Sequence, residues 1–251
     1  MIKGELDIAL IPANVAGVLY NKTEGGISVI DINTLGVLYL VSGDNTVDSM
    51  ESLRGRTIYL TGRGTTPDYV LQYLLKANGI DLSECTLEYR SEATEVAALL
   101  AEQPQAVGLL PQPFVTVACA RNEALGVALD LNEQWELAQG EGGSSMVTGV
   151  TVVRNAFLQE YPEAVVRFLE EHAASVLSIQ EDPDQGAVLV TAAGIVAEEP
   201  TARQAIPRCN ITYIDGAEMR QALSGYLQVL FEQDPAAVGG ALPGADFYYI
   251  P

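Results

Sequence analysis

Short apolar runs alternate along the chain with segments whose apolar residues recur every three or four positions. The run LDIALI at 6–11 is typical of a buried strand, and the segment 66–79 has apolar residues at 70, 71, 74 and 75, on one helical face. Further strands are predicted at ISVIDI, VLYLVS, TLEYR, AVGLLP, LGVALDL and VTGVTVVR. Helical segments separate most of these strands, so the pattern predicts an α/β fold with mostly parallel sheets.

The number of predicted strands favours two modest sheets over a single large one. Strand–helix units between 57 and 112 are sufficient to close a small domain, and the β-branched runs VLYLV and VTGVTVV are suitable places for the chain to pass between domains. We therefore predict two lobes joined by two hinge crossings. Lobe one contains 1–43 and 136–251, and lobe two contains 44–135.

Composition and charge restrict the class of partner. The 251 residues are 48% hydrophobic and 18% charged, which is typical of a globular protein. The 33 acidic and 13 basic residues give a net charge of −20. A field of that sign repels a phosphate backbone, so we predict no nucleic-acid partner.

Residues that commonly carry catalysis or bind metals are sparse. Cys85, Cys119 and Cys209 form no CxxC pair and no zinc spacing, and we interpret them as small buried side chains. His172, in FLEEHAASVL, is interpreted as an ordinary residue on a helix face. No pair of carboxylates stands at matched strand ends. We predict no catalytic residue, no metal and no cofactor.

The first residues carry neither a membrane span nor a secretory signal. No apolar run reaches the ~18 residues that a membrane span needs. Met1 is followed within seven residues by Lys3, Glu5 and Asp7, which do not fit a signal peptide. The chain starts on the approach to a predicted core strand, and we expect that a further segment belongs upstream of it.

The glycine-rich stretch LTGRGTTPDYV at 60–70 joins a predicted strand to a predicted helix. Gly62 and Gly64 allow a ligand to approach the backbone, and Thr65 or Thr66 can cap the helix. Free N–H groups at the helix start attract a carboxylate, sulfonate or phosphate. Arg63 can add a positive charge. The alternative is a tight turn with no ligand.

Nucleotide-binding readings of this stretch have little support. The sequence GRGTTPDY lacks the Lys-Ser/Thr ending of a P-loop. It also lacks the third glycine of a dinucleotide fingerprint, and Pro67 stands near that position.

Other predicted strand ends carry short polar side chains. Ligands of such folds bind outside the carboxyl ends of strands, where IPAN, INTLG and LPQPF lie. Asn14, Thr34 and Gln112 offer hydrogen-bonding groups there. A capping or turn role is the alternative for each of them.

Taken in order, the segments resemble a known family. The stretches that carry the resemblance are GELDIALIPANVAGVLYNK, LGVLYLV, SMESLRGRTIYLTGRGTTPDYVLQYLLKANGIDL, AVGLLPQPFVTVA, TGVTVVRNAFLQEYPEAVVRFLEE and CNITYIDGAEMRQALSGYLQVLFEQDPAAVGGALP. They are similar to the substrate-binding proteins of ABC importers, in the type II periplasmic-binding-protein group of nitrate, sulfonate, taurine and thiamine-precursor binders. The resemblance extends from Met1 to about Pro243.

The resemblance implies a hinged, two-lobed, periplasmic-binding-protein-like protein that closes on a small anionic or heterocyclic solute. It implies an ABC permease and ATPase as partners, and an extracytoplasmic lipoprotein as the full-length form. The ligand-binding residues that it implies are Pro12, Ala13, Asn14, Thr34, Leu35, Gly36, Gly62, Arg63, Gly64, Thr65, Thr66, Gln112, Pro113 and, as the weaker candidate, Thr148.

The chain departs from this pattern in two ways. The family's signal and first βα unit are absent, so we expect an incomplete lobe one that can form a homodimer through its uncovered sheet. Enzymes also occur on this fold. Pyrimidine synthases need a cysteine-rich motif that this chain lacks, which leaves a chorismate dehydratase-like protein of menaquinone synthesis as the alternative function.

Overall fold

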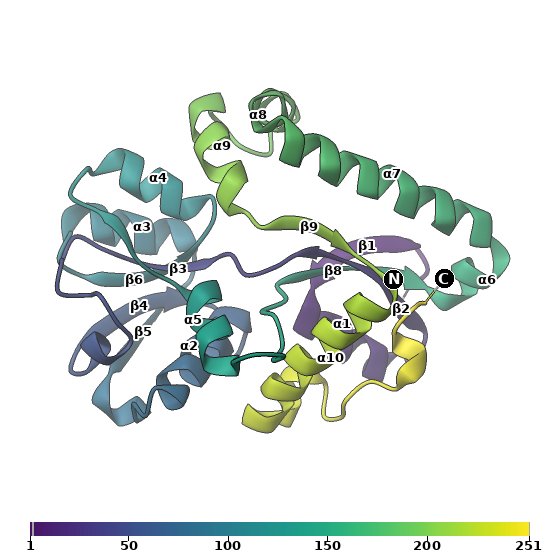
Figure 1. Ribbon diagram of the computed structural model, residues 1–251, viewed down its shortest axis with the longest axis horizontal. Helices are drawn as coiled ribbons and strands as arrows, with labels where there is room; N and C mark the ends of the chain where they lie inside the picture. Colours follow the sequence, from purple (N-terminus) through teal and green to yellow (C-terminus); the bar gives the residue numbers. More distant parts are fainter. Residues whose placement is uncertain (2, 251) are drawn as a thin grey trace. The chain divides into compact units, whose positions relative to one another are not determined.

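The computed structural model describes residue 1 and residues 3–250, which form two compact units. Unit 1 comprises Met1–Leu35, Gly143–Asp182 and Asn210–Pro251. Unit 2 comprises Gly36–Gly142 and Pro183–Cys209. Each unit has its own sheet, with helices packed against it (Figure 1). The two-sheet α/β architecture that the sequence predicts is therefore confirmed.

The sheet of unit 1 has the strand order β1-β8-β2-β9. Its strands are β1 (Ile8–Pro12), β2 (Ile27–Thr34), β8 (Gly149–Arg154) and β9 (Ile211–Ile214). Adjacent strands are antiparallel throughout this sheet. The prediction of a mostly parallel sheet is wrong for unit 1. The reason is that β8 runs in the opposite direction between β1 and β2, which point the same way but are not neighbours.

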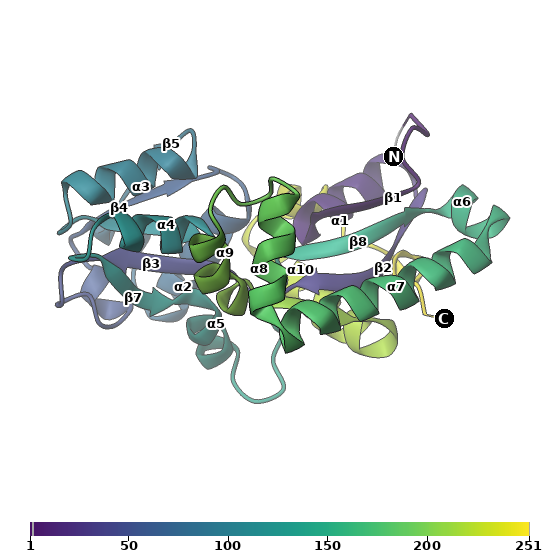
Figure 2. The ribbon, with the colours of Figure 1, turned by 90° about the horizontal axis from the view of Figure 1, so that it is seen from above.

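Helices cover both faces of this sheet. Helix α7 (Pro162–Glu181) lies over one face (Figure 1 and Figure 2). Its Val165 and Leu169 pack in one cluster with Ile30 and Val153 of the sheet. On the other face lie α1 (Ala13–Lys22) and α10 (Gly216–Gln233), which contact each other (Figure 1). Shorter helical segments complete the unit: α6 (Asn155–Glu160), η4 (Pro235–Val238) and η5 (Ala245–Phe247).

The sheet of unit 2 has the strand order β5-β4-β6-β3-β7. Its strands are β3 (Leu38–Ser42), β4 (Thr57–Thr61), β5 (Thr86–Arg90), β6 (Val107–Pro111) and β7 (Gly126–Asp130). Strand β4 is parallel to β5 and β6, whereas β3 is antiparallel to β6 and β7. The sheet is mixed, as the sequence predicts, but only two of its four adjacent strand pairs are parallel.

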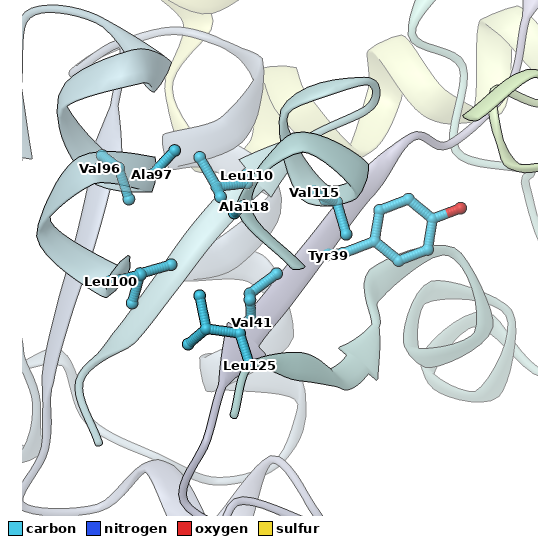
Figure 3. Close-up of a cluster of buried hydrophobic side chains, with 9 residues drawn as sticks. All are labelled: Tyr39, Val41, Val96, Ala97, Leu100, Leu110, Val115, Ala118 and Leu125. Carbon is cyan, nitrogen blue, oxygen red and sulfur yellow. The ribbon is translucent and has the colours of Figure 1, made fainter. Parts of the chain in front are cut away.

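In the described part of unit 2, four helices contact strands of this sheet: α2 (Thr66–Ala77), α3 (Ala93–Glu102), α4 (Phe114–Arg121) and α5 (Leu131–Gln139). Helices α8 (Pro183–Ala192) and α9 (Glu199–Ala205) contact each other, and α9 contacts α4. The short 3-10 helices of the unit are η1 (Glu51–Leu53), η2 (Leu82–Glu84) and η3 (Ile206–Arg208). Figure 3 shows the core between α3, α4 and the sheet, where Leu100, Leu110, Val115 and Ala118 are buried.

The bounds of the units depart from those that the sequence suggests. The chain passes between the units after Leu35, Gly142, Asp182 and Cys209, so it crosses four times and not twice. Strand β3 joins unit 2 because it is hydrogen-bonded between β6 and β7. The segment Pro183–Cys209 joins unit 2 as well, and there the hydroxyl of Tyr39 donates to the carbonyl of Arg208 at 2.9 Å.

Candidate functional site

In unit 1, several candidate residues meet where β1 and β2 end and β8 begins. Pro12 and Thr34 both pair with Gly149 in the sheet. The N–H of Ala13 donates to the carbonyl of Thr148 at 3.0 Å, and the N–H of Thr148 donates to the carbonyl of Thr34, also at 3.0 Å. We call Pro12, Ala13, Thr34 and Thr148 the unit 1 edge. The structure thus brings together four residues, from three separate stretches of the sequence, that the family resemblance implies as ligand-binding.

Two further candidates of unit 1 use their polar groups in packing. The Asn14 side chain is 7% exposed, and its Nδ2 donates to the carbonyl of Ala237 at 3.4 Å. The N–H of Leu35 donates to the carbonyl of Asn210 at 3.1 Å. These bonds attach the ends of β1 and β2 to the C-terminal part of the unit, so both residues support the edge.

In unit 2, the corresponding place is where β4 and β6 end and β3 begins. Gln112 directly follows β6, and its N–H donates to the carbonyl of Val37 at 3.2 Å, which places it next to the start of β3. Gly36 precedes Val37 in the sequence, and Pro113 follows Gln112. We call Gly36, Gln112 and Pro113 the unit 2 edge. The glycine-rich loop 62–66 leaves the neighbouring strand β4 in the same direction.

One polar atom at each edge is buried without a hydrogen-bond partner in the described part of the chain. These atoms are Oγ1 of Thr148 and Nε2 of Gln112. The Gln112 side chain is only 8% exposed, and its Oε1 already accepts from Oγ1 of Thr116 at 2.9 Å. That contact directs Nε2 away from Thr116. Unpaired buried polar groups are uncommon in native proteins, and Oγ1 of Thr191 and Nε2 of Gln233 share this property away from the edges. Each atom therefore has hydrogen-bonding capacity that water or a bound molecule can use.

The glycine-rich loop differs from the expected anion cradle. Gly62 and Gly64 have positive φ values of 72° and 71°, which favour glycine. However, the N–H of Gly64 donates to Oδ2 of Asp68 at 2.7 Å, and the N–H of Thr65 donates to the carbonyl of Gly62 at 2.9 Å. The expectation that these N–H groups are free is wrong, because the buried carboxylate of Asp68 occupies the position where an external anion would bind.

The helix cap also differs from the prediction. Thr65 occupies the N-cap position of α2, but its side chain makes no cap hydrogen bond. Its Oγ1 donates instead to the carbonyl of Gly62 at 2.6 Å, so the threonine stabilises the turn and not the helix. Thr66 is the first residue of α2 and is 8% exposed.

Arg63 belongs to a small cluster that fixes the loop. Its guanidinium lies over the ring of Tyr89 at 4.4 Å, and the Tyr89 hydroxyl donates to Oδ1 of Asp68 at 2.7 Å. Burial and the contact with Asp68 raise the pKa of Tyr89 to about 12. The positive charge of Arg63 is thus held at a defined position by a cation–π contact.

A group of polar residues that the sequence analysis did not select lies behind the unit 1 edge. Asp31 and Thr151 are 0% exposed and Asn33 is 7% exposed. They are hydrogen-bonded to one another, and Nδ1 of His172 lies 3.3 Å from Oδ2 of Asp31. The available signal was the pair of polar residues inside the apolar strand ISVIDINT, together with the only histidine of the chain.

Within the described residues, no cluster of at least three histidine, cysteine or acidic side chains is arranged to hold a metal ion. Over the same residues, no helix is both long and apolar enough to cross a membrane.

Comparisons with known proteins agree with the resemblance seen in the sequence. A structure of an ABC transporter from Parabacteroides distasonis is 28% identical, with a TM-score of 0.82, and covers 100% of this chain and 82% of its own. The periplasmic aliphatic sulphonate binding protein SsuA from Escherichia coli is 10% identical, with a TM-score of 0.74, over 94% of this chain and 77% of its own. The desulfurization enzyme DSZB is 15% identical, with a TM-score of 0.62, over 96% of this chain and 83% of its own.

The structural likenesses and the family model establish different things. The two structures at 10% and 15% identity establish the fold alone, and they include both a binding protein and an enzyme. The resemblance to ABC-importer binding proteins is confirmed, and the expectation of a binding protein over an enzyme agrees with it. No curated protein matches the chain. The family model described as "NMT1/THI5 like" matches residues 27–186, more than half of the chain, and the chain therefore belongs to the NMT1/THI5-like family.

Proposed function

We propose that this protein is the solute-binding component of an ABC importer. The observation that carries the proposal is the pair of buried, unpartnered polar atoms, Thr148 Oγ1 and Gln112 Nε2, at the unit 1 edge and the unit 2 edge. Such atoms cost free energy in the empty protein, about 1–3 kcal/mol for each neutral group. A polar solute that pairs with either atom recovers the free energy of that group on binding. The family and the ABC-transporter structure at 28% identity support the same role.

The other candidate residues receive narrower roles in this proposal. Thr34, Thr148 and Gln112 contact the solute through their side chains, whereas Pro12, Ala13, Leu35, Gly36 and Pro113 shape the edges through their backbones. Asn14 supports the unit 1 edge from behind. In the loop, Gly62, Gly64, Thr65 and Thr66 hold the turn, and Arg63 supplies the accessible charge.

The proposed partners and location follow from this role. The protein delivers its solute to a membrane permease that an ATPase drives, and it acts outside the cytoplasm as a lipid-anchored protein. Recovery of the full-length protein in the membrane fraction of its native cells, and its release by a lipoprotein-cleaving treatment, tests the anchor. Recovery in the soluble cytoplasmic fraction contradicts it.

We also propose a homodimer, because one edge strand of the unit 1 sheet is exposed. Strand β1 stands at the edge of its sheet, and Leu10 on this strand is 59% exposed. An exposed apolar edge strand favours pairing with a second copy. Light scattering should then give the mass of a dimer for the wild type and of a monomer for Leu10→Lys. A monomeric wild type rules out this dimer without affecting the solute-binding proposal.

Enzymatic function on the same fold remains the second candidate, because DSZB shares the fold. It requires a reacting group at the edges, where the side chains are threonine, glutamine and arginine. Mass spectrometry of the solute after incubation with the protein distinguishes the two candidate functions. A binding protein returns its solute unchanged after long incubation, whereas an enzyme converts it.

The direct test is a thermal-shift screen of the purified chain against sulfonates, thiamine precursors, riboflavin-like compounds and amino acids. A solute at one hundred times its Kd stabilises the protein by about 2.7 kcal/mol. For a chain of this length, that corresponds to a rise in Tm of roughly 5–10 °C. The expected result is such a rise for one chemical class. No rise with any of these classes contradicts the proposed role.

A further inference from the structure

A continuous chain of hydrogen bonds connects the only histidine of the protein to the unit 1 edge. The hydroxyl of Thr34 donates to Oδ1 of Asn33 at 2.9 Å, and Nδ2 of Asn33 donates to Oγ1 of Thr151 at 3.1 Å. The hydroxyl of Thr151 donates to Oδ1 of Asp31 at 2.9 Å. The second carboxylate oxygen, Oδ2, lies 3.3 Å from Nδ1 of His172 on α7. All five residues belong to unit 1.

The amide nitrogen of Asn33 fixes the direction of the bonds in this chain. It can only donate, so the Thr151 oxygen accepts from it and Thr151 gives its own hydroxyl proton to Asp31. This orientation turns the amide oxygen of Asn33 toward Thr34, whose hydroxyl donates to it. Thr34 consequently has no proton left for a ligand, but its oxygen keeps the capacity to accept.

The surroundings hold this arrangement in place. Asp31 and Thr151 are wholly buried, which makes an unpaired member of the chain costly. Gly149 lies against the other end: a Cβ there would lie 2.5 Å from Oδ1 of Asn33 and 3.2 Å from Oγ1 of Thr34. The first distance is too short for any side chain, so glycine is required for Asn33 to keep this position.

We propose that Asp31, Thr151 and Asn33 are positioning residues that fix Thr34 as a hydrogen-bond acceptor, so that the solute group bound there is an N–H or O–H donor. The inference rests on the proposed solute-binding function and narrows its ligand class. The negative end of the chain polarises the bonds so that electron density at the Thr34 oxygen rises. An ammonium, amide or hydroxyl group is favoured at Thr34, and a bare sulfonate or carboxylate oxygen is disfavoured.

The unit 2 edge requires the opposite chemistry. Nε2 of Gln112 is a donor without a partner in the described residues, so it needs an acceptor.

The first experiment needs no ligand. Because His172 is the only histidine, its ring gives one assignable set of NMR signals. At fixed pH, Thr34→Val should shift the His172 ring signals in the wild-type background and in Thr151→Ser, which keeps the hydroxyl. Thr34→Val should leave the His172 signals unmoved in the Thr151→Val background, because valine has a similar shape to threonine but interrupts the chain of hydrogen bonds. Equal shifts in all three backgrounds, or none in any, overturn the positioning role.

The second experiment tests the donor assignment with two probes that differ by one ammonium group, 2-aminoethanesulfonate and ethanesulfonate. The amino compound should move the His172 signals and bind the wild type about five- to tenfold more tightly than Thr34→Val or Thr151→Val. Ethanesulfonate should not move these signals. Equal responses to both probes, or to neither up to the solubility limit, overturn the assignment.

The two proposals fail in distinguishable ways. In one outcome, no solute class gives a thermal shift, but Thr34→Val moves the His172 signals only when residue 151 keeps its hydroxyl. The positioning chain is then supported and the proposed function is contradicted. In the other outcome, the protein binds a solute tightly, but the affinity is the same in Thr151→Val and Thr151→Ser. The proposed function is then supported and the positioning chain is contradicted.

Discussion

The hydroxyl of Thr151 donates to the carboxylate of Asp31 across the β2–β8 pair at 2.9 Å, with both side chains wholly buried. The two residues are direct partners in the antiparallel register. A register shift between Val29 and Asp31 inserts an extra residue, Ile30, before the pair. Ile30 packs in the core beneath α7, and Asp31 reaches His172 on the same helix. The irregularity therefore allows one strand to supply both an apolar contact and a buried carboxylate to α7.

Removal of the Asp31 carboxylate should destabilise the protein strongly. Asp31→Ala leaves the Thr151 hydroxyl and the His172 nitrogen without this partner in the interior, at a cost of about 3 kcal/mol. Asp31→Asn should cost less, because an amide oxygen still accepts from Thr151. Urea unfolding followed by circular dichroism measures both variants. A free energy of unfolding for Asp31→Ala within experimental error of the wild type contradicts this account.

Much of the fold is predictable from periodicity. The alternation of apolar runs and amphipathic segments is sufficient to locate strands such as β4 and helices such as α2. Strand order is harder, because β8 inserts between β1 and β2 and periodicity carries no information on that pairing. Helix α5 was missed because its only wholly buried residues are Leu131 and Trp135. Its start signal was present: the Asp130 side chain accepts from the N–H of Asn132 at 2.8 Å as an N-cap.

The two loop glycines should differ in their tolerance of alanine. Both have positive φ, which costs an alanine about 1–2 kcal/mol. At Gly62 a Cβ would also lie 2.2 Å from Oγ1 of Thr65, which must rotate and lose its bond to the Gly62 carbonyl. At Gly64 the nearest such atom is the Tyr69 hydroxyl oxygen at 3.9 Å. Gly62→Ala should therefore cost about 1 kcal/mol more than Gly64→Ala in urea unfolding.

The matched control is the same pair of substitutions in a Thr65→Ala background. Without the Thr65 hydroxyl, the two alanines should cost the same. A difference that persists in that background shows that the Thr65 contact is not its cause.

Tyr89 should make stability fall at alkaline pH. Its pKa is raised from 10.0 to about 12, first by desolvation and then by the hydrogen bond and charge of Asp68. The unfolded chain loses this proton near pH 10, so the folded state holds more protons between the two values. The contribution of Tyr89 to stability is therefore complete below pH 10 and disappears as the pH rises to about 12.

Asp68→Asn separates the two causes. Without the carboxylate charge, the pKa of Tyr89 should fall, because desolvation alone then opposes the lowering effect of the Arg63 charge. The difference in ultraviolet absorbance between each protein and its Tyr89→Phe derivative isolates this one tyrosine during alkaline titration. An unchanged midpoint in Asp68→Asn shows that Asp68 does not contribute.

The unpartnered amide of Gln112 should be needed for binding and not for folding. Gln112→Leu removes Nε2 together with the 2.9 Å bond between Oε1 and Thr116. Thr116→Val removes the same bond and leaves Nε2 in place. We expect Gln112→Leu to weaken solute binding about tenfold more than Thr116→Val, with similar unfolding free energies for the two variants. Equal affinities in the two variants exclude a role for Nε2.

The candidate site was less predictable than the fold, for a physical reason. Strand ends with short polar residues can be recognised from sequence, as for Asn14, Thr34 and Gln112, whereas Thr148 was suggested only by the family resemblance. Whether a polar group is already paired depends on residues that are distant in sequence, such as Ala237 for Asn14. The buried chain behind Thr34 depends on a register shift in β2, which leaves no clear mark in the sequence.

The central claim is that the chain binds a small polar solute reversibly, with candidate contacts at Thr34 and Thr148 on the unit 1 edge and, separately, at Gln112 on the unit 2 edge. Titration calorimetry of the wild type with the solute that raises its Tm most measures this directly. The account predicts saturable one-to-one binding that weakens about tenfold in Gln112→Leu and in Thr34→Val, with the solute recovered unchanged. Affinity that is unaltered in both variants, or chemical conversion of the solute, would contradict it.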